Sequence, residues 1–245
     1  MFQPFTAILG CTHECNLRIG KTMLTQAAED YLKSIYKLQE KGGKVSTGIL
    51  AEYLDVKPAS ATGMIKKLKS MNLVSHQRYQ GVTLTDAGKA VALEIIRHHR
   101  LLELYLNKAL GVPWDGVHEE AEKLEHVISE DVEARMDEFL GYPTADPHGS
   151  PIPDKNGVVP ETQSIPMTDI QNGQSCVVAE VSDDDSALLR HLGSFNLYPG
   201  TAFQVLEVAP FDGPFTIDIA GQQAVIGREV AKNIFVNKVD TIDIA

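Results

Sequence analysis

The stretch KPASATGMIKKLKSMNLVSHQRYQGVTL, residues 57–84, decides the fold of the first part of the chain. The Lys-Pro pair at its start predicts a helix, because a proline at the first helical position has no N–H that would need a partner. Ala61, Ile65 and Leu68 recur at helical spacing and predict one buried face. Two short strand-like runs, with a polar turn between them, follow at residues 73–84. The stretch therefore predicts a helix followed by a β-hairpin.

Two further helices are expected before this stretch. Apolar residues recur at spacings of three and four between Thr25 and Lys41, and Ser46 or Thr47 can cap a short helix that ends at Leu54. Three short helices and then a two-stranded hairpin are typical of a winged helix-turn-helix. In such a module the recognition helix lies in the major groove of DNA.

The charge pattern supports a DNA-binding face. Residues 57–81 carry five basic residues and no acidic one, and such bases neutralise phosphates. Short hydroxyl side chains near the start of the third helix suit base edges or phosphates. A solvated lysine face on an ordinary helical domain is the alternative, but the order of the elements favours DNA. The predicted DNA-binding residues are Lys57, Ala59, Ser60, Thr62, Lys66, Lys67, Lys69 and Arg78.

The composition of the whole chain excludes several classes of protein. The 245 residues have a formal net charge of −11, so the chain is not basic throughout and any nucleic-acid contact has to be local. The sequence contains no run of about 18 apolar residues, so no membrane span is predicted. Cys11, Cys15 and Cys176 form no disulfide framework, which favours the reducing cytoplasm.

The remainder of the chain changes character near its middle. A long helix is expected over residues 86–110 and another from about 115 to 140. Residues 141–166 are rich in proline and glycine and are interpreted as a loop or linker. Short apolar alternations after residue 167 predict a small β-barrel, with one short helix at 186–194. The predicted fold class is α+β.

Histidines and carboxylates gather on the two predicted central helices. His118, Glu122, Glu125 and His126 follow one another at offsets of four, three and one, which places them along one stripe. Two glutamates at this spacing repel each other unless a cation lies between them. The preceding helix adds His99 and Glu103, and Asp30 interrupts the apolar pattern of the first helix. Solvent-facing acids on an acidic helix are the alternative interpretation.

These segments resemble the diphtheria-toxin-repressor family of metal-dependent bacterial repressors, and most closely its manganese-sensing members with three domains. The resemblance rests on EDYLKSIY (29–36), KPASATGMIKKL (57–68), RHHRLLE (97–103), HEEAEKLEHVIS (118–129) and PHGSPIP (147–153). It implies a winged-helix domain at 23–88, an all-α dimerisation and metal-binding domain at 89–142, a linker at 143–166 and an SH3-like, FeoA-like domain at 167–245.

The resemblance implies two metal sites. The primary site would consist of Asp30, Glu122, Glu125 and His126. Asp30 and Glu122 stand where iron-sensing relatives have a methionine and a cysteine, and a ligand set of oxygen and nitrogen suits Mn²⁺ better than one with soft sulfur. The secondary site would consist of His99, Glu103, His118 and an acid from residues 180–185. Asp183 is predicted to be this acid, with Glu180 as the second choice.

The function that the resemblance implies is a manganese-activated repressor of metal-uptake genes. Such a protein is expected in the cytoplasm as a homodimer on double-stranded operator DNA, with no membrane and no small organic substrate as partner. An iron-activated repressor of the same family, a winged-helix regulator that answers an organic ligand and a metal-dependent hydrolase are the alternatives. A hydrolase is disfavoured because no nucleophile or general base stands apart from the ligands, so no enzyme is predicted.

The N-terminal residues 1–22 lack any helical or alternating period and are predicted to form a flexible extension. Cys11, His13 and Cys15 have the spacing Cys-x-His-x-Cys, which could bind a metal but lacks a second pair of ligands.

Overall fold

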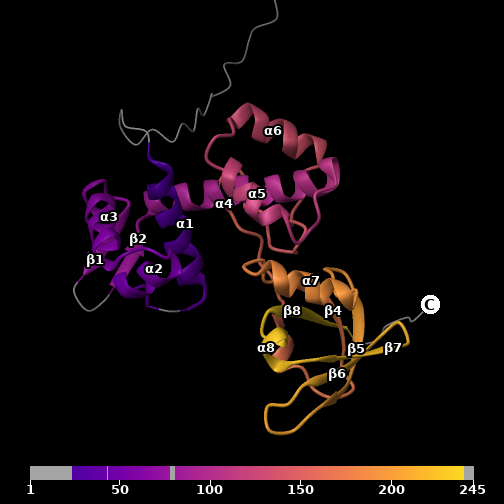
Figure 1. The fold of residues 1–245 in the computed structure, drawn as a ribbon. Helices are drawn as coiled ribbons and strands as arrows, with labels where there is room; N and C mark the ends of the chain where they lie inside the picture. Colours follow the sequence, from indigo (N-terminus) through magenta and orange to yellow (C-terminus); the bar gives the residue numbers. More distant parts are fainter. Residues whose placement is uncertain (1–23, 43, 78–80, 240–245) are drawn as a thin grey trace, which may run out of the picture. The chain divides into compact units, whose positions relative to one another are not determined.

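The computed structural model describes residues 24–42, 44–77 and 81–239 (Figure 1). The chain divides into two compact units, residues 1–91 and 92–245. Three sequence-based predictions lie outside the described residues. These are the N-terminal extension, the cysteines and histidine within it, and the DNA contact of Arg78. Among the described residues, no helix has both the length and the apolar character of a membrane span.

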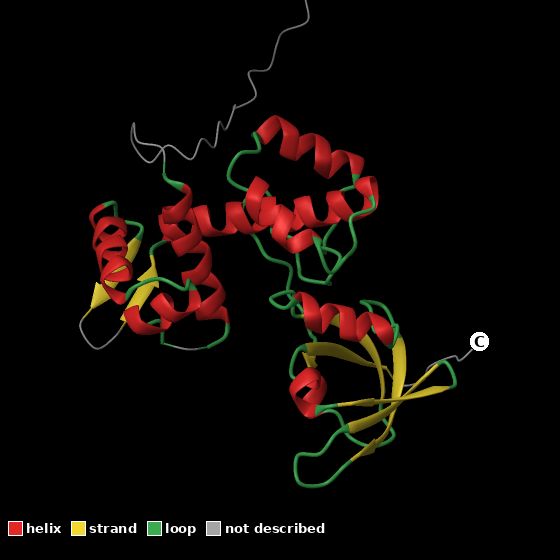
Figure 2. Ribbon diagram, in the orientation of Figure 1, coloured by secondary structure: helices red, strands yellow, loops and turns green. Residues whose placement is uncertain are grey.

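The first unit contains the predicted helices and hairpin (Figure 2). The elements are α1 (Gln26–Glu40), α2 (Thr47–Tyr53), α3 (Pro58–Ser70), β1 (Val74–Gln77) and β2 (Gly81–Leu84). Ser46 begins α2, since its hydroxyl accepts the N–H of Ile49 at 3.2 Å. The two strands pair antiparallel, with Val74 opposite Leu84. Buried apolar side chains of all three helices and the hairpin form the core, among them Leu32, Ile35, Leu50, Ile65 and Val82.

Helix α4 (Asp86–Leu110) begins in the first unit, and its residues from Ala92 onward belong to the second. The prediction of one helix from about residue 115 to 140 is wrong. Two helices occupy this stretch, α5 (Val117–Leu124) and α6 (Glu130–Phe139). Ser129 is the reason for the break, because it is extended and its hydroxyl caps a new helix by accepting the N–H of Val132.

The helices of the second unit pack around a small apolar core. Leu102 and Leu106 of α4 meet Val117 and Ala121 of α5 and Met136 of α6. A buried ion-pair network adds to this packing, since Arg97 on α4 contacts Glu133 at 2.5 Å and Asp137 at 2.6 Å, both on α6. The core and the network together set the positions of α5 and α6 on α4.

The C-terminal part of the second unit is a six-stranded antiparallel sheet. Its strands are β3 (Ile165–Pro166), β4 (Ser175–Val181), β5 (Ala202–Val208), β6 (Phe215–Ile219), β7 (Gln222–Ile226) and β8 (Ile234–Val239), in the spatial order β3-β8-β4-β5-β6-β7. The predicted helix α7 (Ser186–Ser194) follows β4, and the short η1 (Met167–Asp169) and α8 (Arg228–Ala231) complete the elements. The sequence interpretation missed β8, whose Ile-Phe-Val start reads as a continuous apolar run rather than an alternation.

Candidate metal centre

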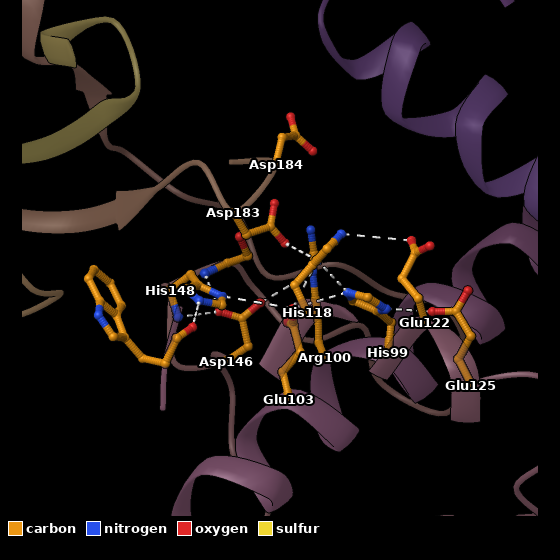
Figure 3. A network of polar contacts seen from close by, with 12 residues as sticks. His99, Arg100, Glu103, His118, Glu122, Glu125, Asp146, His148, Asp183 and Asp184 are labelled. Atoms are coloured by element: carbon orange, nitrogen blue, oxygen red, sulfur yellow. Dashed lines mark hydrogen bonds and ion pairs between the residues drawn. The ribbon is translucent and has the colours of Figure 1, made fainter. Parts of the chain in front are cut away.

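The residues of the predicted secondary site come together in the second unit (Figure 3). His99 and Glu103 lie four residues apart on α4 and are 3% and 0% exposed. His118 comes from the first turn of α5, and Asp183 lies two residues before Asp185, the N-cap of α7. Each of the four offers a ligand atom, and these atoms lie within 4.8 Å of one another.

The four side chains also contact one another directly. Glu103 Oε1 lies 3.0 Å from His99 Nε2 and 3.2 Å from His118 Nδ1. Asp183 Oδ2 lies 3.4 Å from the same nitrogen of His118. Glu180, the second choice after Asp183, accepts a hydrogen bond from the hydroxyl of Ser150 at 2.7 Å.

Charges and hydrogen bonds within this cluster outweigh the effect of burial on two of its pKa values. Burial by itself would lower the pKa of His118, but the hydrogen bonds and charges of Asp183 and Glu103 outweigh it and raise the pKa to about 10. Burial would raise the pKa of Glu103, but the histidines His99 and His118 outweigh it and lower the pKa to about 2. The raised pKa of His118 and the lowered pKa of Glu103 both favour an ion pair between the two side chains.

The sequence interpretation missed two residues of this cluster, Asp146 and His148. Both belong to the stretch that was interpreted as a linker, and both are buried. Asp146 Oδ1 accepts the backbone N–H groups of His148 at 2.8 Å and of Ser150 at 3.0 Å. Glu103, Asp146 and His148 each offer a ligand atom within 4.8 Å of the others. The available signal was the pair of ligand-type residues two positions apart in a proline-rich loop.

The ring of His148 is oriented as metal-binding histidines usually are. Its Nε2 lies 2.7 Å from the carbonyl oxygen of Trp114, and because a carbonyl only accepts, Nε2 carries the hydrogen. In the neutral ring Nδ1 then presents its lone pair. A backbone carbonyl that fixes the tautomer in this way is the common support of a histidine ligand.

Three acceptor atoms in this group lack a donor among the described residues. They are Glu103 Oε2, Asp146 Oδ2 and His148 Nδ1, and all three are buried. Burial and the charge of Glu103 raise the pKa of Asp146 well above its usual range, and the charge of Arg100 opposes this only in part. Buried acceptors without a donor are costly in free energy, and a divalent cation would satisfy all three. The residues present therefore fit a metal ion.

The loop that carries Asp146 and His148 is fastened to the sheet. Gly149 has φ +88°, and a Cβ atom there would lie 2.0 Å from the carbonyl oxygen of Ala179 in β4. A hydrogen bond also joins the loop to β4, because the N–H of Val181 donates to the carbonyl of His148 at 2.9 Å. A glycine is required at this point because the backbone of β4 occupies the space of a side chain.

We expect Gly149→Ala to lower the free energy of unfolding of the metal-free protein by about 3 kcal/mol or more, because both the left-handed backbone and the contact with β4 resist the methyl group. Urea unfolding in the presence of a chelator measures this. Gly173→Ala is the matched control, since Gly173 has φ +79° but no atom within 4 Å of its Cβ position. It should cost only about 1 kcal/mol. Equal losses for the two variants would contradict the assigned role of β4.

The residues of the predicted primary site belong to both units. Asp30 lies on α1, in the first unit. Glu125 is the C-cap residue of α5 and is 1% exposed. Its Oε1 lies 3.4 Å from His126 Nε2, and its Oε2 lies 2.5 Å from His99 Nδ1. The side chain of Glu122 is half exposed. Within the second unit, the structure thus brings Glu122 and Glu125 together with His99.

The predicted DNA-binding residues lie on α3 or directly before it. Lys57, Ala59, Ser60, Thr62, Lys66, Lys67 and Lys69 are exposed. The side chains of two of them make hydrogen bonds, since Thr62 Oγ1 donates to the carbonyl of Pro58 at 2.8 Å and Lys69 Nζ donates to that of His76 at 3.0 Å. Lys69 therefore ties α3 to the first strand of the hairpin, and Lys66 and Lys67 point to solvent.

Three family models match the chain in order. They are described as the N-terminal DNA binding domain of iron dependent repressors (residues 23–82), their metal binding and dimerisation domain (85–154) and the FeoA domain (165–238). The iron-dependent repressor IdeR of Mycobacterium tuberculosis is 33% identical over 229 residues, which are 88% of this chain and 99% of IdeR. The chain belongs to the diphtheria-toxin-repressor family.

Solved structures of members of the diphtheria-toxin-repressor family agree with this. A manganese-dependent transcriptional repressor in complex with manganese is 40% identical, has a TM-score of 0.82 and matches 86% of this chain and 100% of its own. The manganese regulator SloR is 34% identical, with a TM-score of 0.73 over 88% of this chain and 100% of SloR. The predicted winged helix, helical domain and SH3-like domain are confirmed. The family consists of metal-dependent transcriptional repressors and not of enzymes.

Proposed function

We propose that this repressor is activated by Mn²⁺, controls genes for metal-ion uptake, and acts in the cytoplasm as a homodimer on double-stranded operator DNA. The observation that carries the proposal is the chemistry of the donors, all of which are carboxylate oxygens or imidazole nitrogens. Hard carboxylate ligands suit Mn²⁺, and a site without sulfur offers nothing to metals that prefer soft ligands. The manganese-dependent repressor with a TM-score of 0.82 supports the choice of metal.

The primary metal site is proposed to consist of Asp30, Glu122, Glu125 and His126. For the second, the sequence-based set of His99, Glu103, His118 and Asp183 shares Glu103 with the group of Asp146 and His148. The buried acceptors that lack a hydrogen-bond donor among the described residues favour Asp146 and His148 as further ligands. The proposed second site therefore centres on Glu103 and draws its other ligands from His99, His118, Asp183, Asp146 and His148.

The bound ion supplies positive charge and fixed coordination directions. The chain's own acids explain why DNA binding would depend on it, since carboxylates gathered in one place repel one another in its absence. Asp30 precedes the DNA-reading helices, and Glu122, Glu125 and His126 belong to the dimerisation domain. A metal ion bound by Asp30 and by these dimerisation-domain residues would hold the two recognition helices of a dimer at the spacing of two half-sites. DNA and metal then strengthen each other's binding.

An iron-activated repressor is the second candidate, favoured by the 33% identity to the iron-dependent IdeR. Fluorescence anisotropy with DNA from upstream of the gene decides between the two. The titration is run with Mn²⁺, with Fe²⁺ under anaerobic conditions, with Zn²⁺ and with a chelator. We expect tight binding with micromolar Mn²⁺ and weak binding with the chelator. Tighter binding with Fe²⁺ would favour iron, and binding without any metal would refute both candidates.

The lysines of α3 provide a test of the DNA-binding face. Lys66→Gln should weaken binding to all DNA sequences about equally, because a lysine on a phosphate carries no sequence information. It should also reduce the slope of log affinity against log salt by about 1, because the variant neutralises one phosphate fewer. Lys155→Gln is the control, since it removes the same charge from an exposed residue of the second unit. The interface is wrong if the two variants change the slope equally.

A further inference from the structure

The outer edge of strand β7 is open. β7 is the last strand on its side of the sheet, and among the described residues β6 is the strand with which it pairs (Figure 1). All five residues of β7 pair with β6 in one register, without a bulge. The side chain of Val225 is 58% exposed, and Gln222 and Gln223 are exposed as well. A second strand therefore has access to this edge.

The opposite edge of the sheet is protected, whereas β7 is not. The last strand on that side, β3, has only two residues, and one of them is Pro166. Short strands, prolines and charged side chains are the usual means of keeping an edge from pairing with another chain. The stretch IAGQQAVIG (219–227) has neither a proline nor a charged residue. Although the chain has a net charge of −11, two copies of this stretch bring no like charges together.

The hairpin between β6 and β7 determines which backbone groups face the open edge. The turn at residues 220–221 has φ values of +51° and +84°, as in the common two-residue hairpin. The residues that flank such a turn, here Ile219 and Gln222, exchange hydrogen bonds, and every second residue of β7 after Gln222 then bonds to β6. The residues between them, Gln223 and Val225, direct their N–H and C=O groups to the open edge.

These outward groups are complementary to those of a second β7. If two copies lie antiparallel about an axis at Ala224, Gln223 of each copy faces Val225 of the other. Each such pair can exchange both of its N–H···O hydrogen bonds. Ala224 then faces its own copy in a pair without hydrogen bonds, where the Cα atoms approach to about 4.5 Å. The short side chain of alanine fits this close approach.

We propose that the edge of β7 is a contact surface for a second copy of this chain, which pairs with it antiparallel about Ala224. The surface is separate from residues 85–154, which match the metal binding and dimerisation domain of the family. The few hydrogen bonds make this contact weak by itself, and it acts where other interactions hold copies at an effective concentration of about a millimolar. Repressor copies bound to neighbouring stretches of DNA meet this condition.

Oxidative cross-linking of the full chain tests the register, because a disulfide traps even a short-lived pair. Cys11 and Cys15 are replaced by serine, and Cys176 is buried. Ala224→Cys should form disulfide-linked pairs at least about tenfold faster than Gln222→Cys. In the proposed pair two copies of residue 222 lie four residues apart along the strand, which is about 14 Å and beyond the limit of about 7 Å for a disulfide.

Two charge variants in the Ala224→Cys background separate pairing from random collision. Gln223→Lys with Val225→Lys places like charges opposite each other and should slow cross-linking at least about fivefold. Gln223→Lys with Val225→Glu places opposite charges in the same pairs and should restore the parent rate. Both positions are exposed, so the two variants should unfold at the same urea concentration as their parent.

Three results would overturn the proposal. The first is equal rates for Ala224→Cys and Gln222→Cys, which would mean collision or another register. The second is an equal effect of the two charge variants, since the antiparallel pair requires opposite effects. The third is an Ala224→Cys chain that cross-links only after residues 240–245 are removed, because those residues would then be the ones that cover the edge.

Discussion

Replacing Glu122 and Glu125 together with alanine is expected to abolish metal-dependent DNA binding. The affinity for DNA should fall at least about 100-fold at a Mn²⁺ concentration that saturates the wild-type protein. Mn²⁺ favours the DNA-binding state only because it binds that state more tightly, and the variant loses this difference in affinity. Two of the four proposed primary donors are then missing. The residual binding should match that of the wild-type protein with a chelator. Anisotropy titrations with and without Mn²⁺ measure both quantities.

The same helix offers a matched control. Glu119 and Glu120 are exposed on α5, so Glu119→Ala with Glu120→Ala removes the same charge from the same element. This variant should keep its response to Mn²⁺. The primary site as proposed would be wrong if the Glu122 and Glu125 double variant bound DNA tightly and independently of metal. A general effect of acidic charge, rather than of ligands, would appear as equal losses in both variants.

Asp146→Asn is expected to act with opposite sign on the metal-free and the metal-loaded protein. The asparagine side chain would keep an acceptor oxygen for the N–H groups of His148 and Ser150, but the substitution would remove a buried charge beside Glu103. The metal-free protein should gain about 1 kcal/mol in free energy of unfolding, as buried charges without full compensation destabilise a fold. The extra stability that saturating Mn²⁺ provides should fall by about 2–3 kcal/mol, which is the contribution of one site at about 100 times its Kd.

The gain in the metal-free protein should depend on pH. The folded-state pKa of Asp146 is raised above its unfolded value. Asp146 therefore increasingly lowers the free energy of unfolding of the wild-type protein as the pH rises from the unfolded pKa toward the folded pKa. Below the unfolded pKa this cost is absent, and the gain from Asp146→Asn should vanish there. Asp154→Asn should have the reverse sign, because hydrogen bonds from Val158 and Asn156 lower the pKa of Asp154. Urea unfolding across the pH range measures both, and a gain that does not change with pH would contradict the buried-charge explanation.

Local patterns were sufficient for the elements of the first unit. The helical spacing of Ala61, Ile65 and Leu68 and the apolar runs around the turn at 78–81 are short-range signals, and they correctly predicted α3 and the hairpin. The break between α5 and α6 was also local, yet it was missed. Ser129 can occur inside a helix or cap one, and the flanking residues favour a helix in either case.

The donors of the proposed primary site and half of the second were candidates from sequence, because carboxylates and histidines at helical spacing share a face before any tertiary contact forms. Asp183 was selected from an acidic stretch by resemblance, and the structure places it 3.4 Å from His118. No local pattern could have made this choice, since the two residues lie on different elements that only packing brings together.

Asp146 and His148 depended entirely on the tertiary structure. In the sequence they belong to a proline- and glycine-rich stretch that is typical of an exposed linker. Their burial results from contacts with distant residues, namely the carbonyl of Trp114 and the backbone of β4 at Ala179 and Val181. The sequence by itself thus determined the secondary structure around the helices and the chemical nature of the donors. Long-range packing decided which of the described acceptors are buried without a donor, because burial depends on residues far away in the chain.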